Sequence, residues 1–209
     1  MRFRDRSDAG SQLAARLSGI DLTEPVVLGI PRGGVVIAAV IARALDADLD
    51  VVLSRKLPTP GQPELALGAV SEDGHVVINP DVARMVQFAD EELDAIRRHE
   101  EAEIARRRQL FRGGAPRVPV EGRSVIVTDD GIATGATMIA ALQELRTRKP
   151  KELILAVPVA ATSRLAEVSR WADRTVCLFD TDDFYAVGQF YDDFRQVEDA
   201  EVVETLHRV

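Results

Sequence analysis

VIVTDDGIATGAT, residues 125–137, passes from an apolar run through two aspartates and a turn of small residues into a predicted helix. The apolar run predicts a buried strand with Asp129 and Asp130 at its carboxyl end. The turn supplies Gly135 and two threonine hydroxyl groups where the helix begins. A strand, a turn and a helix in this order form the repeating unit of a parallel sheet, so these residues predict an α/β fold.

The same residues predict a binding site for a phosphorylated sugar. A helix N-terminus carries unpaired N–H groups and a partial positive charge, which favour a phosphate group. Carboxylates beside a phosphate suit sugar hydroxyl groups, or a magnesium ion that bridges to the ligand. The alternative is an ordinary strand–helix unit in which Asp129 and Asp130 only cap or solvate the turn.

Strand-like and helix-like segments alternate along the rest of the chain, which predicts a mostly parallel, twisted sheet with helices on both faces. Residues 1–209 hold no convincing linker, so we expect a single domain. The predicted strands are residues 26–30, 49–54, 125–128, 152–157 and 175–179, with a hairpin at 69–71 and 75–79. The predicted helices are residues 7–17, 90–111, 162–171 and 199–206, with an alanine-rich helix ending near residue 45 and another opening at 136–138.

Two further strand ends carry basic residues. The first strand is followed by the turn Pro31–Gly34, which contains Arg32, and the second delivers Arg55 and Lys56 into a proline-rich loop at 57–67, LPTPGQPELAL. Ligands bind beyond the carboxyl ends of the strands in open parallel sheets, so we expect these basic side chains to face the aspartates. The alternatives are a tight turn before a helix and an exposed basic pair on a disordered loop.

Residues 125–137 resemble the phosphoribosyl-pyrophosphate (PRPP) motif of the type I phosphoribosyltransferases in residue type, spacing and strand–turn–helix context. The resemblance implies that Asp129 and Asp130 hold the ribose hydroxyl groups, directly or through Mg²⁺. It also implies that the following loop wraps the 5′-phosphate. The loop residues are Ala133, Thr134, Gly135, Ala136 and Thr137.

The resemblance extends to the basic strand ends. Arg32 and Gly33 are similar to the pyrophosphate loop of the family, where a basic or small residue precedes a glycine. Arg55 and Lys56 stand where family members carry a mobile loop that closes over the pyrophosphate. Closure excludes water from a ribosyl centre that would otherwise be hydrolysed. The resemblance therefore implies that Arg32, Arg55 and Lys56 serve catalysis on the pyrophosphate side.

The base side departs from the family in part. Ala133 stands where the purine-salvage branch commonly has an aspartate that exchanges a proton with the base, and pyrimidine-type members also lack an acid there. Tyr185, Asp192 and Arg195 resemble residues in the hood of the 6-oxopurine enzymes. The resemblance implies that Tyr185 stacks on the base, that Asp192 lies near the base and the metal, and that Arg195 contacts the pyrophosphate. The segment is shorter here, and the base-reading lysine of those enzymes has no clear counterpart after Val157.

The resemblance also implies the layout of the domain. Residues 20–180 form the core, and the hood is built from about 1–18 and 181–209 together with the long charged helix at 90–111. That helix is either a solvated helix or one that faces a partner. Since dimers are common in the family, a homodimer is the expected assembly.

Composition narrows the functional classes. A net charge of −8 argues against nonspecific nucleic-acid binding, which requires a basic field. Cys177 is the single cysteine, so no disulfide forms within the chain, and we expect a buried structural thiol. The three histidines lack a metal-ligand spacing, so any metal is expected to be Mg²⁺. No apolar run approaches a membrane span and no secretory signal opens the chain, which predicts a cytoplasmic protein.

These observations lead to two hypotheses of different classes. The first is an enzyme that binds Mg-PRPP and transfers its 5-phosphoribosyl group to a nitrogenous, nucleobase-like acceptor, releasing pyrophosphate and a nucleoside monophosphate. The second is a non-catalytic regulator that binds PRPP or nucleotides. A kinase or hydrolase is disfavoured, because the chain lacks a G-x-x-x-x-G-K-[ST] loop and a serine in a nucleophile elbow.

Overall fold

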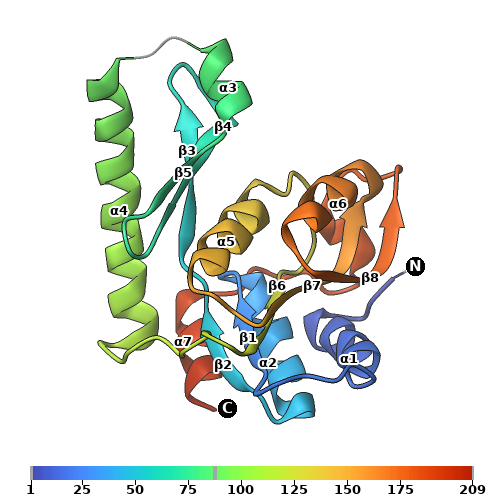
Figure 1. Cartoon of the computed structure of the whole chain (residues 1–209). Coiled ribbons are helices and arrows are strands. Elements are labelled where there is room, and N and C mark those ends of the chain that lie inside the picture. Colours follow the sequence, from blue (N-terminus) through green and yellow to red (C-terminus); the bar gives the residue numbers. More distant parts are fainter. Residues whose placement is uncertain (1, 87–88, 209) are drawn as a thin grey trace.

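A five-stranded parallel sheet lies at the centre of the computed structural model, which describes residues 2–86 and 89–208 (Figure 1). Its strands run in the order β2-β1-β6-β7-β8, and every neighbouring pair is parallel. The strands are β1 (Val26–Gly29), β2 (Asp48–Val51), β6 (Ser124–Thr128), β7 (Glu152–Ala161) and β8 (Arg174–Thr181). All residues of β1 and β6 are buried, which explains why both read as continuous apolar runs. The predicted α/β fold is confirmed.

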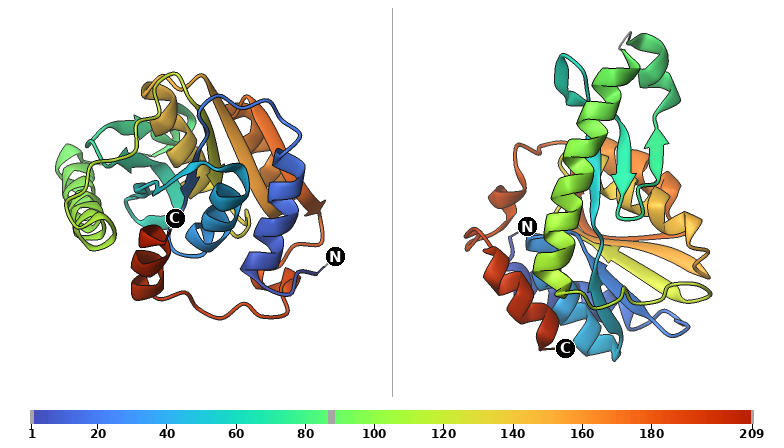
Figure 2. Two further views of the ribbon diagram at one scale, coloured as in Figure 1. Left: turned by 90° about the horizontal axis from the view of Figure 1, so that it is seen from below. Right: turned by 90° about the vertical axis from the view of Figure 1, so that its left-hand side faces the viewer.

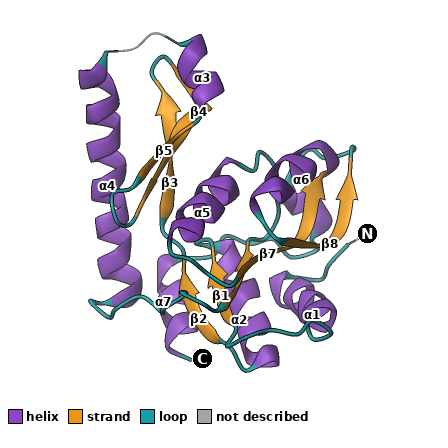
Figure 3. Ribbon diagram, viewed as in Figure 1, coloured by secondary structure: helices purple, strands orange, loops and turns teal. Residues whose placement is uncertain are grey.

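Helices cover both faces of this sheet, as Figure 3 shows. On one face α1 (Arg6–Leu17) and α2 (Gly33–Leu45) pack on a core that includes Val27, Ile126 and Ile154. On the other face α5 (Ala136–Thr147) and α6 (Thr162–Val168), which continues as η1 (Ser169–Trp171), pack on a core with the alternate strand residues. Each strand therefore contributes one side to each core, as the alternation of side chains requires.

A second, antiparallel sheet stands away from the central one. It joins β3 (Ser54–Thr59), β4 (Gln62–Ser71) and β5 (Val76–Ile78), with β3 and β4 connected through Gly61, whose φ is 74°. Its β4–β5 hairpin was predicted at 69–71 and 75–79, but the pairing of β3 with β4 was not. The expected proline-rich loop at 57–67 is therefore a β-hairpin, and the second strand of the central sheet ends at Val51 instead of Ser54. Arg55 and Lys56 lie within β3. The ladder shifts register around Pro58, because proline cannot donate to it.

Two helices complete this second lobe, which comprises residues 54–112 (Figure 2). They are α3 (Pro80–Met85), which was not predicted, and the long charged helix α4 (Asp90–Arg112), which was. Glu103 pairs with Arg107 at four-residue spacing and also with Arg106. At the end of α4, the buried Arg112 donates to Asp50 at 2.8 Å and to Glu72 at 2.6 Å. These contacts fasten the lobe to β2 at the edge of the central sheet.

The segments near the two chain ends lie beside each other and do not form the projecting lobe. Phe3 forms an isolated parallel bridge with Tyr191, just after η2 (Val187–Phe190), so the first residues run beside 190–193. The final helix α7 (Asp199–His207) packs with α2 and α4, where Val202 joins a core containing Val35 and Ile104. The lobe that rises above the sheet is the internal segment 54–112 (Figure 1).

Two remaining expectations concern the cysteine and the membrane. Cys177 is half-buried, its thiol donates to the carbonyl of Phe179, and burial raises its pKa to about 11, which leaves it a poor nucleophile at neutral pH. No helix in the described residues is long and apolar enough to cross a membrane.

Candidate functional site

The turn after β1 packs directly against the acidic end of β6. The two strands are parallel neighbours, so their carboxyl ends meet at one edge. A Cβ on Gly33 would collide with Oδ2 of Asp130, and one on Gly34 would lie 2.7 Å from the carbonyl oxygen of Thr128. Only glycine permits this approach, which carries Arg32 to the mouth of the site. The sequence-predicted turn and aspartates are therefore adjacent.

The two aspartates have different partners. Asp130 Oδ2 accepts a 2.9 Å hydrogen bond from Nε of Arg6 and lies 2.8 Å from its Nη2, in an ion pair that is largely buried. The backbone carbonyl of Asp130 accepts a 2.7 Å hydrogen bond from the Tyr191 hydroxyl. Asp129 Oδ1 accepts the N–H of Asp130, at 2.8 Å, and its carboxyl group faces a cavity. Asp130 is thus held by a remote arginine, whereas Asp129 is available to a ligand.

Arg6 was missed in the sequence and links both ends of the chain to the acids. Its Nη1 donates to the carbonyl of Arg195 at 2.8 Å, and its guanidinium lies 4.0 Å from the centre of the Phe194 ring. The available signal was helical spacing, because Arg6 shares the buried face of α1 with Ala9, Leu13 and Leu17. The predicted helix began at Ser7 and so excluded it.

Burial and mutual repulsion perturb the acid pair. Burial, together with the charge of Asp130, raises the pKa of Asp129 well above its usual range. Burial also raises the pKa of Asp130, while the charge of Arg6 opposes that rise. A cation bound beside Asp129 would ionise it.

The donor set fits magnesium. Mg²⁺ is usually held by one or two carboxylates together with substrate phosphates and waters, not by a full protein cage. Among the described residues, no group of three histidine, cysteine or acidic side chains could hold a metal by itself. The carboxyl of Asp129 and the hydroxyl-bearing Thr137 line the same cavity. Asp129 could hold the ion once a phosphorylated ligand supplied the remaining oxygens.

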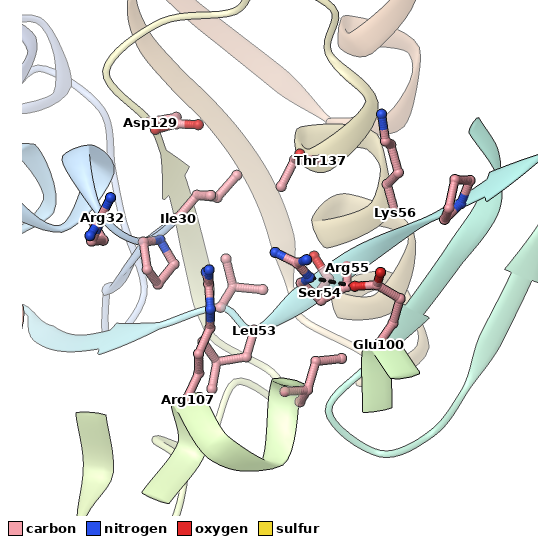
Figure 4. Close-up of a pocket in the computed structure, with 14 residues that line it drawn as sticks. Ile30, Arg32, Leu53, Ser54, Arg55, Lys56, Glu100, Arg107, Asp129 and Thr137 are labelled. Atoms are coloured by element: carbon pink, nitrogen blue, oxygen red, sulfur yellow. Dashed lines mark hydrogen bonds and ion pairs between the residues drawn. The ribbon is translucent and has the colours of Figure 1, made fainter. Parts of the chain in front are cut away.

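A cavity of about 620 Å³ opens beside these residues and lies between the central sheet and the second lobe (Figure 4). Three predicted basic residues reach it, Arg32 from the turn after β1 and Arg55 and Lys56 from β3. Two charged residues of α4, Glu100 and Arg107, also line it and were not predicted. In a chain of net charge −8, this cavity therefore has four basic and two acidic side chains in its wall.

The loop before α5 presents its backbone to a second cavity, of about 380 Å³. Gly135 precedes the helix with a φ of 81° and lies so close to Val168 that a Cβ would approach Cγ2 to 2.6 Å. No side chain of the described residues caps this helix start, which leaves its first N–H groups available to an anion. The wall of the cavity includes Ala133, Thr134, Arg164, Asp182, Phe184 and Tyr185.

The three residues predicted to bind the base are not brought together. Tyr185 reaches the second cavity and is 87% exposed. Asp192 forms an exposed ion pair with Arg2 at 3.3 Å, and Arg195 pairs with Glu201 at 2.8 Å. Neither Asp192 nor Arg195 lines a described cavity, because residues 190–193 follow the N-terminal segment along the protein. Asp182 and Phe184 occupy the cavity wall in their place.

Comparison with known proteins identifies the family. Residues 6–195 match the model of the phosphoribosyl transferase domain. The chain belongs to this family. The matched segment begins at Arg6 and ends at Arg195, the residues that meet beside Asp130.

The relatives agree with this assignment. The chain is 47% identical over 206 residues to the Mycobacterium tuberculosis H37Rv protein named "Putative phosphoribosyl transferase Rv0571c", matching 99% of this chain and 46% of that protein. It thus spans about half the length of the curated relatives it matches. The crystal structure of TT1426 from Thermus thermophilus is 43% identical, covers 99% of this chain and 98% of that one, and superposes with a TM-score of 0.90.

A distant structure shares the fold of this phosphoribosyl transferase domain. It is a hypothetical protein from Neisseria gonorrhoeae with bound ppGpp, 14% identical, with a TM-score of 0.51, covering 99% of this chain and 97% of that one.

Proposed function

We propose that this phosphoribosyl transferase domain binds Mg-PRPP and transfers its 5-phosphoribosyl group to a nitrogenous base, releasing pyrophosphate. The observation that carries the proposal is the arrangement of two cavities around the segment Asp129–Thr137. A strongly basic cavity contains Asp129 and Thr137, and a second cavity with two aromatic side chains contains Ala133 and Thr134. A substrate with a pyrophosphate at one end and a reacting carbon between the cavities matches this arrangement.

The proposed binding mode assigns each part of PRPP to described groups. The 5′-phosphate binds the free N–H groups at the start of α5 and the Thr134 and Thr137 hydroxyls. The ribose hydroxyls lie at the acid pair, with Asp129 also facing the metal and Asp130 oriented by Arg6. The pyrophosphate enters the basic cavity. Magnesium, when bound, neutralises the pyrophosphate and stabilises its departure.

The reaction is a substitution at C1 of the ribose. The bond from C1 to the pyrophosphate oxygen breaks, with its electron pair leaving on pyrophosphate, and a bond from C1 to a ring nitrogen forms. Arg32, Arg55 and Lys56 stabilise the negative charge on the leaving group. Because Ala133 cannot take the proton that the nitrogen loses, we assign that proton to Asp182, the acid in the wall of the second cavity.

The test is PRPP-dependent release of pyrophosphate in the presence of Mg²⁺ and a panel of purine, pyrimidine and other nitrogen bases. We expect one class of base to stimulate release and its nucleoside monophosphate to form. Asp182→Asn should lower kcat at an unchanged Kd for PRPP. Binding of PRPP with no stimulation by any base would contradict the transfer step.

The second candidate, a non-catalytic PRPP-binding regulator, draws support from one observation. Ala133 lines the second cavity at the position where an acid could exchange a proton with the base, and alanine cannot do so. A regulator should bind Mg-PRPP saturably and turn nothing over, even at enzyme concentrations comparable to those of the substrate. The same base panel, run under single-turnover conditions, separates the two functions.

A further inference from the structure

The long helix α4 forms one wall of the basic cavity. Glu100, Ile104 and Arg107 lie on the same face of the helix at spacings of four and three residues, and all three line the cavity. Ile104 is 3% exposed and packs in the core that joins the lobe to α2, so this face cannot turn away from the site. The helix is therefore fixed beside the predicted basic residues.

Arg107 has donors to spare. Its Nε donates to Glu103 at 2.8 Å, and within the described residues its two terminal NH₂ groups donate no hydrogen bond. In Figure 4 its side chain rises from α4 toward the space between Arg32 and Arg55. A guanidinium carries five N–H donors in a planar fork, so the free edge suits two oxygens of a phosphate group.

Glu100 is an unexpected neighbour for an anion. Its side chain is 10% exposed, and a lone carboxylate there would repel pyrophosphate. However, Glu100 Oε2 accepts a 2.7 Å hydrogen bond from Nε of Arg55. A bond at Nε sets the plane and direction of the guanidinium without using its terminal nitrogens. Figure 4 shows this contact between Arg55 and Glu100 beside the cavity.

We infer that α4 completes the pyrophosphate subsite: Arg107 binds the pyrophosphate group directly, and Glu100 is a positioning residue that aims Arg55 at the same group. The inference rests on the proposed function and extends it to a helix outside the central sheet. It means that the leaving group is held from both lobes, by Arg32 on one side and by β3 and α4 on the other.

The helix offers a matched control for Arg107. Arg106 precedes it and donates to the same Glu103 from Nε and Nη2, at 2.8 and 3.0 Å, but it is more exposed and does not line the cavity. Calorimetry would compare Arg107→Gln with Arg106→Gln for Mg-PRPP, magnesium pyrophosphate and ribose 5-phosphate. We expect Arg107→Gln to weaken PRPP and pyrophosphate binding about tenfold, with ribose 5-phosphate unchanged, whereas Arg106→Gln changes none of the three.

Two substitutions test Glu100. The amide oxygen in Glu100→Gln still accepts from Arg55, so binding of pyrophosphate should be retained within about twofold or become tighter, because one negative charge is removed. Glu100→Ala releases Arg55 and should weaken binding about fivefold. Equal losses in both variants would overturn the positioning role, since charge rather than orientation would then matter. Thermal unfolding of each variant verifies that the lobe remains folded.

The outcomes separate this inference from the proposed function. Wild-type protein that binds neither PRPP nor pyrophosphate would overturn both. Wild-type protein that binds PRPP, together with Arg107→Gln that behaves like Arg106→Gln, would overturn the inference and leave the proposed function intact. Loss of ribose 5-phosphate affinity in Arg107→Gln would also overturn it, because the effect would then not be confined to the pyrophosphate.

Discussion

Asp129 and Asp130 are adjacent in sequence, yet their surroundings suit them to different tasks. Arg6 forms an ion pair and a hydrogen bond with Asp130, so this acid keeps a defined orientation. Asp129 receives one backbone N–H, and its pKa is raised by burial and by its neighbour. The fold therefore disfavours the ionised form of Asp129 at the position where we expect a cation to bind. Such a loss of stability is common at functional sites.

Asp129→Asn should stabilise the free protein and abolish ligand binding. The pKa of Asp129 is higher in the folded state than in the unfolded state. Between these two pKa values the folded protein holds a proton that the unfolded chain has lost, so the free energy of unfolding falls as pH rises through this range. Asparagine removes this loss and can still accept the N–H of Asp130. We expect the Tm at pH 8 to rise by about 2–4 °C, the shift that about 1 kcal/mol gives a domain of this size.

Calorimetric scans at pH 8 and pH 4 provide the measurement for Asp129→Asn. At pH 4 the gain should be smaller, because the wild-type carboxyl is then protonated in the folded state and partly protonated in the unfolded state, where its pKa is the ordinary 3.8. Affinity for Mg-PRPP should fall at least tenfold at pH 8. A variant with lower Tm at pH 8 would contradict the assignment of Asp129 as a strained, ligand-ready acid.

Arg6→Gln should destabilise the protein through Asp130. Breaking one side of a buried ion pair leaves an uncompensated charge, so we expect a loss of about 2–4 kcal/mol in the free energy of unfolding. Without Arg6 the pKa of Asp130 rises further, so the loss should be largest at pH 8 and shrink as pH falls and the carboxyl is protonated. Urea unfolding at several pH values measures this.

Arg4→Gln is the matched control for Arg6→Gln. Its side chain is 82% exposed and lies 3.4 Å from Asp8, so its removal should cost less than about 0.5 kcal/mol. Equal losses in the two variants would show that the interaction of Arg6 with Asp130 contributes nothing specific.

At the scale of elements, α4 and the β3–β4 hairpin determine where the basic residues lie. The lobe is fastened by Arg112, whose side chain is 5% exposed and whose guanidinium also donates to the carbonyl of Val51 at 2.7 Å. This arginine thus ties the end of α4 to the edge strand β2 and, through Glu72, to the β4–β5 turn.

Arg112→Met should cost about 3–5 kcal/mol, because it leaves the carboxyls of Asp50 and Glu72 buried without a cation. Adding Asp50→Asn and Glu72→Gln to this variant should recover part of the loss, since the neutral side chains no longer require a counter-charge. Chemical unfolding of the single and triple variants makes the comparison. A triple variant less stable than the single would contradict a charge-based role.

Local patterns in the sequence predicted most of the central architecture. The strand, aspartates and turn at 125–137 could be found because their geometry depends on neighbouring residues. The β3–β4 hairpin could not, since Pro58, Pro60 and Pro63 resemble a loop and interrupt the alternation of a strand. Strand β7 runs past the predicted end through Pro158 to Ala161, because β8 continues to pair with it.

Site residues were missed where their partners are remote in the chain. Arg6 and Asp130 are separated by 124 positions, and Arg55 and Glu100 by 45. No periodicity within one helix encodes such a pairing. The charge pattern of α4 is typical of a solvent-exposed helix, so it did not indicate a role for Arg107. Helical spacing shows which residues share a face, but not which part of the protein that face contacts.

At the scale of the whole molecule, residues of both lobes line the basic cavity, so a ligand bound there should affect both lobes. In the proposed binding mode, Mg-PRPP should slow hydrogen exchange in residues 54–58 and 98–108 through its pyrophosphate, and in 129–138 through its ribose and 5′-phosphate. Ribose 5-phosphate should protect only 129–138, since it lacks the pyrophosphate. Exchange followed by mass spectrometry measures both, and protection by PRPP confined to 129–138 would contradict a shared site.

The contacts around Asp130 join residues from both ends of the chain, so they cannot all form early in synthesis. Arg6, near the beginning of the chain, donates to the carboxylate of Asp130, and Tyr191, near the other end, donates to its backbone carbonyl. Arg6 also donates to the backbone carbonyl of Arg195. During synthesis on the ribosome, Arg6 and Asp130 are available early, but the contacts from Tyr191 and Arg195 form only after residue 195 has left the exit tunnel. Under the proposed function, we therefore expect a chain terminated before residue 191 to bind PRPP more weakly than the full chain.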